Sequence, residues 1–163
     1  MRTLWLLVLL SLAGCATQPR SELESFHDDP SFATRQRILS VAESLLGAPY
    51  VPGGETPAGM DCSGLVQYAY RQAGIQVPRT ADQLYRAAYQ PERLLPGDLL
   101  FFSTQDAGAS HVGIYAGNGQ MIHVSSGSGQ VRKVSVNLPY WRERFLGGAS
   151  FLNCAGHCLT VSG

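Results

Sequence analysis

The chain has 163 residues, with 12 Lys or Arg and 12 Asp or Glu, so its formal net charge is zero. That balance excludes the strongly basic surface on which sequence-independent nucleic-acid binding depends. The length allows one domain with a sizeable hydrophobic core. The sequence shows no internal repeat and no Gly-rich phosphate-binding loop, and nothing in it predicts a cofactor.

The first 15 residues have the pattern of an export signal. Arg2 precedes an apolar run from Leu4 to Leu10, which is too short to span a bilayer. The following Leu12-Ala13-Gly14-Cys15 matches the bacterial lipobox, so we expect a signal peptide over 1–14 and a membrane lipid anchor on Cys15. An ordinary signal peptide cut nearby is the alternative. Ala16 after the cysteine, rather than Asp, favours the outer membrane facing the periplasm.

Residues 15–32 are expected to form the lipidated cysteine and a flexible tether, because residues 16–30 are polar and lack helical periodicity. A domain is expected over 33–153, followed by a tail over 154–163. The tail contains Cys154 and Cys158, and in an oxidising compartment these predict a local disulfide. A metal site with His157 is the alternative.

Within the domain, helical patterns come first and strand patterns follow. The segments are Ala33–Leu46, Cys62–Ala73 and Ala81–Tyr89 as helices, then Leu99–Ser103, His111–Ala116, Gln120–Val124 and Val131–Val136 as strands. Thr80 and Gln83 form a capping box for the third helix. This order predicts an α+β fold, with N-terminal helices packed on a central antiparallel sheet.

Cys62 is expected in the first turn of the second helix. Asp61 is a good N-cap residue, and Gly74 stands where a left-handed C-terminal cap is expected. The unpaired N–H groups of a helix start stabilise a thiolate, which predicts a lowered pKa for this cysteine. The alternative is that Cys62 is a small buried apolar residue.

Two histidines are expected on one face of a hairpin. A three-residue loop over 117–119 places Ala116 opposite Gln120 and Gly113 opposite His123. His111 and His123 are then diagonal neighbours on one face, and Gly113 leaves room for a ring. Four branched residues of the same two strands point to the opposite, core-facing side: Val112, Ile114, Ile122 and Val124.

A cysteine with two histidines fits two kinds of site. One is nucleophilic catalysis, in which a base activates the thiol and a third group orients the base. The other is a zinc site with Cys62, His111 and His123 as ligands. No compact Cys-x-x-Cys or His-x-x-x-His spacing supports the zinc site, so we predict no metal.

The chain resembles the NlpC-type, papain-like cell-wall cysteine peptidases from about Arg37 to Leu152. The resemblance is carried by ordered blocks: Gly47-Ala48-Pro49-Tyr50, Gly53-Gly54, Asp61-Cys62-Ser63-Gly64, Pro78-Arg79-Thr80 with Gln83, Pro96-Gly97-Asp98-Leu99-Leu100-Phe101-Phe102, His111-Val112-Gly113-Ile114-Tyr115 and Met121-Ile122-His123. It implies a papain-like fold and a role in cleaving amide bonds of peptidoglycan.

The resemblance also implies the roles of single residues. Cys62 is the nucleophile, His111 the general base, and His123 the polar residue that holds the imidazole. Tyr50 stands beside the nucleophile, where its hydroxyl helps the oxyanion site or the substrate.

Three more residues are candidates for substrate binding. Asp61 and Ser63 are implied to receive the peptide's amino group, although Asp61 also fits a simple helix cap. Arg79 fits two roles, binding a substrate carboxylate in a bidentate manner or pairing with a surface acid.

The predicted function is a peptidoglycan hydrolase, with the D-alanyl to meso-diaminopimelate bond favoured over the γ-D-glutamyl to diaminopimelate bond. Two alternatives come from other classes: a non-catalytic wall-binding lipoprotein, and an acyltransferase or amidase on a substrate outside the wall. The intact set of Cys62, His111 and His123 argues against a pure binder. No residue identifies a regulatory protein partner.

Overall fold

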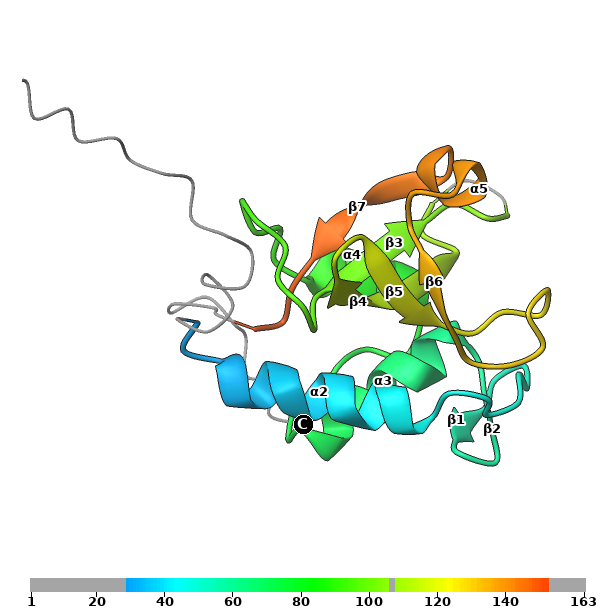
Figure 1. Ribbon diagram of the computed structural model, residues 1–163, viewed down its shortest axis with the longest axis horizontal. Coiled ribbons are helices and arrows are strands. Elements are labelled where there is room, and N and C mark those ends of the chain that lie inside the picture. The colour runs from blue at the N-terminus through cyan, green and yellow to red at the C-terminus, as the bar shows by residue number, and fades with distance from the viewer. Residues whose placement is uncertain (1–28, 106–107, 153–163) are drawn as a thin grey trace, which may run out of the picture.

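The computed structural model describes residues 29–105 and 108–152, and the elements follow the expected order (Figure 1). The helices of this part are α2 (Phe32–Ser44), α3 (Cys62–Gln72), α4 (Ala81–Ala87) and α5 (Pro139–Arg142). The strands are β1 (Glu55–Thr56), β2 (Gly59–Met60), β3 (Leu99–Phe102), β4 (His111–Gly117), β5 (Gln120–His123), β6 (Arg132–Ser135) and β7 (Phe145–Ala149). The predicted α+β class is confirmed.

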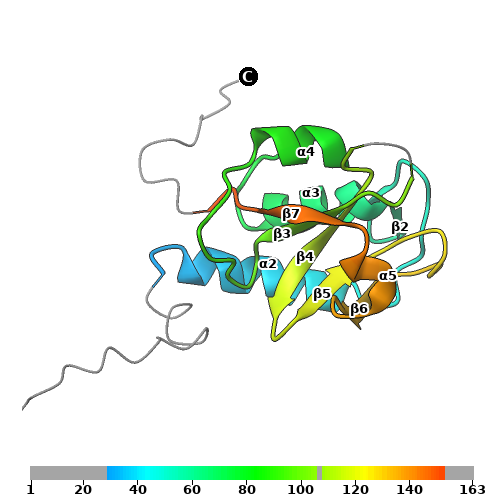
Figure 2. The same ribbon diagram turned by 90° about the horizontal axis from the view of Figure 1, so that it is seen from above.

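One antiparallel sheet forms the centre of the fold, with the strand order β6-β5-β4-β3-β7. Helices α2 and α3 lie side by side against one face of it (Figures 1 and 2). Helix α5 lies against the other face, where Trp141 packs on Leu100, Phe102 and Met121. The strands β1, β2 and β7 and helix α5 were not predicted, because their segments are short or contain several glycines.

Helix α2 forms because its apolar residues recur at helical spacing. The predicted face is buried: Ile38, Val41, Ala42 and Leu45. The helix is slightly shorter than the predicted 33–46, and Gly47 follows it with a left-handed φ of 88°.

Helix α3 begins as the sequence indicates. The Asp61 carboxylate accepts a hydrogen bond from the Gly64 N–H at 2.7 Å, which makes it the N-cap. Gly74 has a φ of 83° just beyond the C-cap residue Ala73. Because α3 packs against both α2 and β4, the position of Cys62 is fixed by the core.

The turn between β4 and β5 differs from the prediction. Instead of a three-residue loop, Asn118 and Gly119 form a two-residue turn, both with positive φ. Gly117 rather than Ala116 lies opposite Gln120, and Ala116 is an unpaired bulge residue. A two-residue turn alone would shift the strand pairing by one residue relative to the predicted three-residue loop. The extra residue in the bulge cancels this shift, so the strands keep the predicted register.

The predicted placement of His111 and His123 on one face of the sheet is therefore confirmed. Ile114 lies opposite Ile122, which places Gly113 opposite His123 and puts His111 and His123 on the same face. The predicted core-facing residues are all fully buried on the other side: Val112, Ile114, Ile122 and Val124.

A buried ion cluster ties the first helix to the sheet. The Arg35 guanidinium lies 2.7 Å from the Asp98 carboxylate and also pairs with Asp29. The Ser150 hydroxyl and the Leu95 N–H donate to Asp98. Asp29, which falls within the predicted tether segment 15–32, is only 8% exposed and packs against α2 through this pair.

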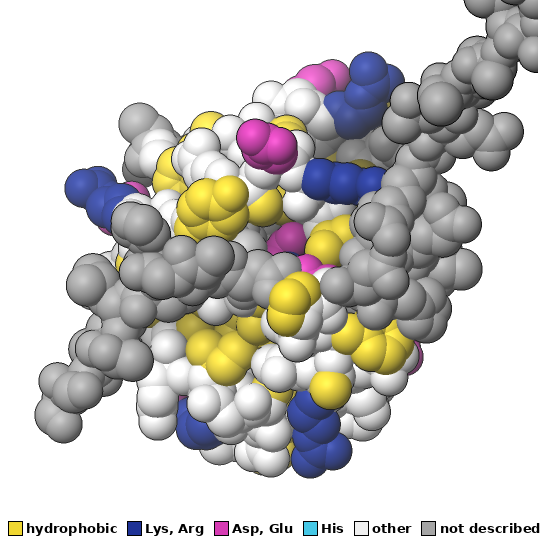
Figure 3. Space-filling view, turned by 90° about the vertical axis from the view of Figure 1, so that its left-hand side faces the viewer, with side chains coloured by type: hydrophobic (Ala, Val, Ile, Leu, Met, Phe, Trp, Pro, Cys, Tyr) yellow, Lys and Arg dark blue, Asp and Glu magenta, His cyan; other side chains and the backbone are white. Residues whose placement is uncertain are grey.

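Several predictions fall outside the described residues. These are the signal peptide, the anchor at Cys15, most of the tether, and the pairing of Cys154 with Cys158. Among the described helices, none combines the length and apolar character that crossing a membrane requires. On the described part of the face in Figure 3, charged side chains of both signs lie among apolar ones, in keeping with the zero net charge.

Candidate active site

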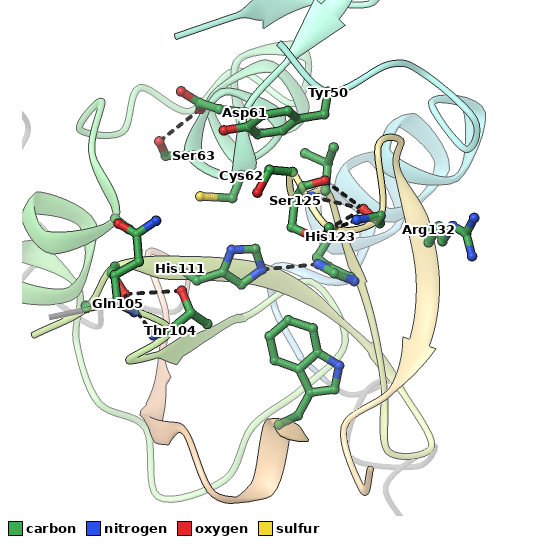
Figure 4. A pocket seen from close by; sticks show the side chains of 18 of the residues that line it. Tyr50, Asp61, Cys62, Ser63, Thr104, Gln105, His111, His123, Ser125 and Arg132 are labelled. Atoms are coloured by element: carbon green, nitrogen blue, oxygen red, sulfur yellow. Dashed lines mark hydrogen bonds between the residues drawn. The ribbon is translucent and has the colours of Figure 1, made fainter. Parts of the chain in front are cut away.

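A cleft of about 950 Å³ lies between the start of α3 and the sheet, and all four predicted catalytic residues line it: Cys62, His111, His123 and Tyr50. Cys62 lies on the helical wall, and His111 and His123 lie on the sheet wall (Figure 4). The core that buries α3 against β4 therefore sets the spacing between nucleophile and base.

The two histidines are hydrogen bonded to each other. Nε2 of His111 lies 3.1 Å from Nδ1 of His123. Because Nε2 of His111 is engaged, its Nδ1 is the nitrogen left for the thiol of Cys62 (Figure 4). For Nδ1 to act as a base, Nε2 must carry the hydrogen and donate it to His123.

Both imidazoles are neutral in this environment. Burial, with the nearby His123, lowers the pKa of His111 to about 3. Burial, with the charge of Arg132, lowers the pKa of His123 to about 4. A neutral His111 can accept a proton, as a general base must.

The expected lowering of the thiol pKa is wrong for this resting state. Burial raises the pKa of the Cys62 thiol, and the Asp61 carboxylate acts in the same direction. The backbone N–H groups of Val112, Ser63 and Cys62 itself oppose the rise without cancelling it. The resting pair is a neutral thiol and a neutral imidazole, so the thiolate forms when His111 takes the proton.

Trp141 belongs to the site and was missed by the sequence analysis. Its indole stacks on His111, with ring centroids 5.3 Å apart and an interplanar angle of 21°. It also meets His123 edge-on at 4.8 Å. Pro139 at the helix start and adjacent aromatic residues signal a short helix, but nothing local links it to His111.

Asp61 and Arg79 form a close ion pair at the rim of the cleft. Nη1 and Nη2 of Arg79 donate to the two carboxylate oxygens of Asp61 at 3.0 and 2.8 Å. Arg79 also donates to the Ser63 hydroxyl at 2.7 Å and pairs with Glu55. Burial acts to raise the pKa of Asp61, but the bonds from Arg79 and Gly64 outweigh it and the net pKa is lowered.

These contacts decide between the two roles of Arg79. Its guanidinium is occupied by Asp61, Ser63 and Glu55, so the structure favours the pairing role over binding of a substrate carboxylate. Asp61 is the helix cap and also accepts a hydrogen bond from the Gly53 N–H at 3.0 Å. The role of Asp61 and Ser63 toward a substrate amine stays a prediction.

Tyr50 lies on the same wall as Cys62 and Asp61, as predicted (Figure 4). Its backbone N–H donates to the Gly129 carbonyl at 2.9 Å, and it forms an isolated bridge with Met60. These bonds fix the backbone that carries the phenol.

Within residues 29–105 and 108–152, no group of three His, Cys, Asp or Glu side chains could hold a metal ion. The side chains that line the cleft include the Cys62 thiol, the hydrogen-bonded pair of His111 and His123, and several hydroxyl groups.

The papain-like layering and the thiol–imidazole pair define a protein of the cysteine-peptidase fold class. Residues 47–150 match the NlpC/P60 family, and the chain belongs to this family.

Among curated proteins, the chain is 41% identical over 130 residues to the murein DD-endopeptidase MepH of Escherichia coli, covering 73% of this chain and 48% of that protein. It is 39% identical over 114 residues to MepS of the same species, a murein DD-endopeptidase and LD-carboxypeptidase, covering 68% and 60%. The first matches also include a γ-DL-glutamyl hydrolase of Bacillus subtilis, of which 28% is covered. The chain thus spans less than two thirds of these relatives.

Solved structures show the same fold. An NLP/P60 family protein from Staphylococcus aureus, described as similar to lipoprotein, has a TM-score of 0.68 and 33% identity, covering 74% of this chain and 42% of that one. The peptidoglycan hydrolase RipB of Mycobacterium tuberculosis has a TM-score of 0.63 and 30% identity, covering 74% and 65%.

Proposed function

We propose that the chain is a cysteine endopeptidase of peptidoglycan. The single observation that carries this proposal is the His111–His123 hydrogen bond of 3.1 Å, which leaves Nδ1 of His111 for the Cys62 thiol in an open cleft. The naming of relatives as murein endopeptidases and a peptidoglycan hydrolase supports the substrate class.

The reaction begins with proton transfer from Cys62 Sγ to Nδ1 of His111. The thiolate attacks the amide carbonyl, and the backbone N–H of Cys62 with the Tyr50 hydroxyl stabilises the oxyanion. His123 holds the imidazolium by accepting its Nε2–H. His111 then gives the proton to the leaving amine, and water hydrolyses the thioester with His111 again as base.

The favoured bond is that between D-alanine and meso-diaminopimelate, which links two stem peptides. The two Escherichia coli relatives named murein DD-endopeptidases support this choice. The γ-D-glutamyl to diaminopimelate bond is the second candidate, and the Bacillus subtilis relative named a γ-DL-glutamyl hydrolase favours keeping it in the test.

The proposed location is the periplasmic side of the outer membrane, with a lipid anchor at Cys15. The lipobox Leu12-Ala13-Gly14-Cys15 and the following Ala16 support it. Metabolic labelling with a fatty-acid analogue, compared between the wild type and Cys15→Ala, tests the anchor directly.

The activity is tested with purified cross-linked and uncross-linked muropeptides, analysed by mass spectrometry. The wild type is expected to convert cross-linked dimers to monomers, and Cys62→Ala to leave them intact. Stem peptides cut at the D-glutamyl bond would select the second candidate bond. No conversion of either substrate by the wild type would contradict the proposed function and bring the wall-binding alternative forward.

A further inference from the structure

The charged residues that line the cleft differ in whether they form an ion pair within the protein. Asp61 is paired with Arg79, and Asp82 is paired with Arg86 at 2.9 Å. Within the described ranges, no carboxylate lies within ion-pair distance of Arg132, which also lines the cleft. Arg132 is exposed, so its guanidinium is accessible to a negatively charged group of a ligand.

The strand register places Arg132 on the catalytic face. Arg132 in β6 is the direct partner of His123 in β5, and paired residues in an antiparallel sheet point to the same face. Figure 4 shows Arg132 on β6 beyond His123, on the side of the site away from Asp61. Its charge reaches the site, because it is one of the causes that lower the pKa of His123.

Apolar surface accompanies this cation. Val134 lies two residues along β6 on the same face, and Tyr140 in α5 lines the same cleft. Arg144 stacks on the Tyr140 ring at 4.2 Å, which holds the ring in place. A cleft that holds a cation, an aliphatic side chain and an aromatic side chain fits a residue with a carboxylate and a hydrocarbon chain.

The chemistry of the substrate indicates which of its carboxylates lies near Arg132. His111 delivers its proton to the leaving amine, so the leaving residue lies on the sheet side of the cleft, where Arg132 is. In the D-alanyl to diaminopimelate bond, the carbon that carries the leaving amine also carries a free carboxylate. That residue has a hydrocarbon chain as well.

We propose that Arg132 is a specificity-determining residue that binds the carboxylate next to the leaving amine, while Val134 and Tyr140 contact the chain of the same residue. This assignment rests on the proposed function and deepens it. Carboxylate binding also offsets the positive charge beside His123, so the correct substrate helps His123 to support the imidazolium that forms on His111.

The test compares two synthetic cross-linked peptides that differ at one group. In one peptide the carboxyl next to the scissile nitrogen is free, and in the other it is a primary amide. Arg132→Gln is expected to lower kcat/KM for the free-carboxyl peptide by about 10- to 100-fold, as loss of a hydrogen bond to a charged group does, mainly through KM. For the amide peptide, the same variant should behave like the wild type.

Two further variants give the controls. Lys133→Gln removes one positive charge from the same strand but from its opposite face, and it should leave the ratio between the two peptides unchanged. Arg132→Lys should keep part of the preference for the free-carboxyl peptide over the amide peptide, because it keeps the charge but not the planar guanidinium.

The outcomes separate this assignment from the proposed function. Suppose that the wild type cleaves the peptides. If Arg132→Gln then lowers kcat/KM by the same factor for both peptides, or leaves kcat/KM unchanged for both, the assignment to Arg132 is overturned and the endopeptidase activity stands. If the wild type cleaves neither peptide, the proposed function is overturned for this bond, and the Arg132 assignment with it.

Discussion

Trp141 lies nearly parallel to the imidazole of His111, with the ring centroids 5.3 Å apart, and it is only 7% exposed. Its edge-on contact with His123 means that one indole covers both partners of the histidine pair. The hydrogen bond between Nε2 of His111 and Nδ1 of His123 is thereby protected from competition with water.

Replacing Trp141 by Ala should therefore weaken catalysis through His111. We expect kcat to fall about tenfold, a part of the roughly 10²–10⁴ that general acid–base catalysis contributes. Because burial is what lowers the pKa of His111, the opened site should raise that pKa and move the acid limb of the kcat/KM profile to higher pH. The measurement is the pH profile of wild type and variant.

Trp141→Phe is the matched control, since it keeps an aromatic ring over the pair. It should retain most of the activity and an almost unchanged acid limb. A Trp141→Ala protein whose pH profile matches the wild type would show that the indole has no part in holding His111.

Gly113 lies opposite His123, and the room it leaves is required. A Cβ built at Gly113 would lie 2.8 Å from the Met121 sulfur and 3.3 Å from the His123 Cβ. Gly113→Ala should displace β5, stretch the bond between His111 and His123, and lower kcat about tenfold or more, since misplaced catalytic groups are costly. Steady-state kinetics at matched folded fractions would measure this.

Ile114→Val is the control for a general loss of stability. Ile114 is next to Gly113 but faces the core, so its shortening should cost about 0.5–1.5 kcal/mol of stability with kcat retained. Equal kcat losses in both variants would refute a specific effect of Gly113 on His123.

The raised pKa of the Cys62 thiol predicts how the free enzyme reacts with an alkylating agent. Only the thiolate reacts, so the rate of iodoacetamide labelling at Cys62 should be low near neutral pH and should rise steadily toward alkaline pH. Labelling is located at Cys62 by peptide mass spectrometry, because the chain has other cysteines. A rate that is constant from about pH 5 to pH 8 would instead indicate a preformed thiolate–imidazolium pair.

The buried ion pair between Arg35 and Asp98 predicts a large effect on stability. Asp98 is fully buried, so Arg35→Ala would leave its charge without its main partner and should cost about 3–5 kcal/mol of unfolding free energy. Arg37→Ala, an exposed position in the same helix, should cost less than about 1 kcal/mol. Urea denaturation compares them, and similar losses would contradict a stabilising role of the pair.

Local patterns predicted those parts of the fold that depend on local rules. The cap at Asp61, the capping box at Thr80 and the buried stripe of α2 each follow from spacing within one helix, and all three are confirmed. The shared face of His111 and His123 was also predicted correctly. The bulge at Ala116 was not predicted. A two-residue turn with a bulge and a three-residue loop give the same pairing of the residues beyond them, so the alternation of apolar residues does not distinguish the two.

The contacts that local patterns missed join segments far apart in the chain. Trp141 reaches His111 only because α5 folds back over the sheet, and Arg79 finds both Asp61 and Glu55 across the start of α3. The pKa of Cys62 was misjudged for a related reason. The helix start favours a thiolate, but burial beside β4 and the charge of Asp61 oppose it more strongly.

The proposed function requires Cys62 to be the nucleophile that attacks a peptidoglycan amide. The most direct measurement is intact-protein mass spectrometry after wild type and Cys62→Ala are mixed with cross-linked muropeptide and quenched in acid within the first turnover. We predict that the wild-type mass increases by that of the acyl part of the substrate, on the peptide that contains Cys62, and that the variant gains none. Product formation by Cys62→Ala at the wild-type rate would contradict the account.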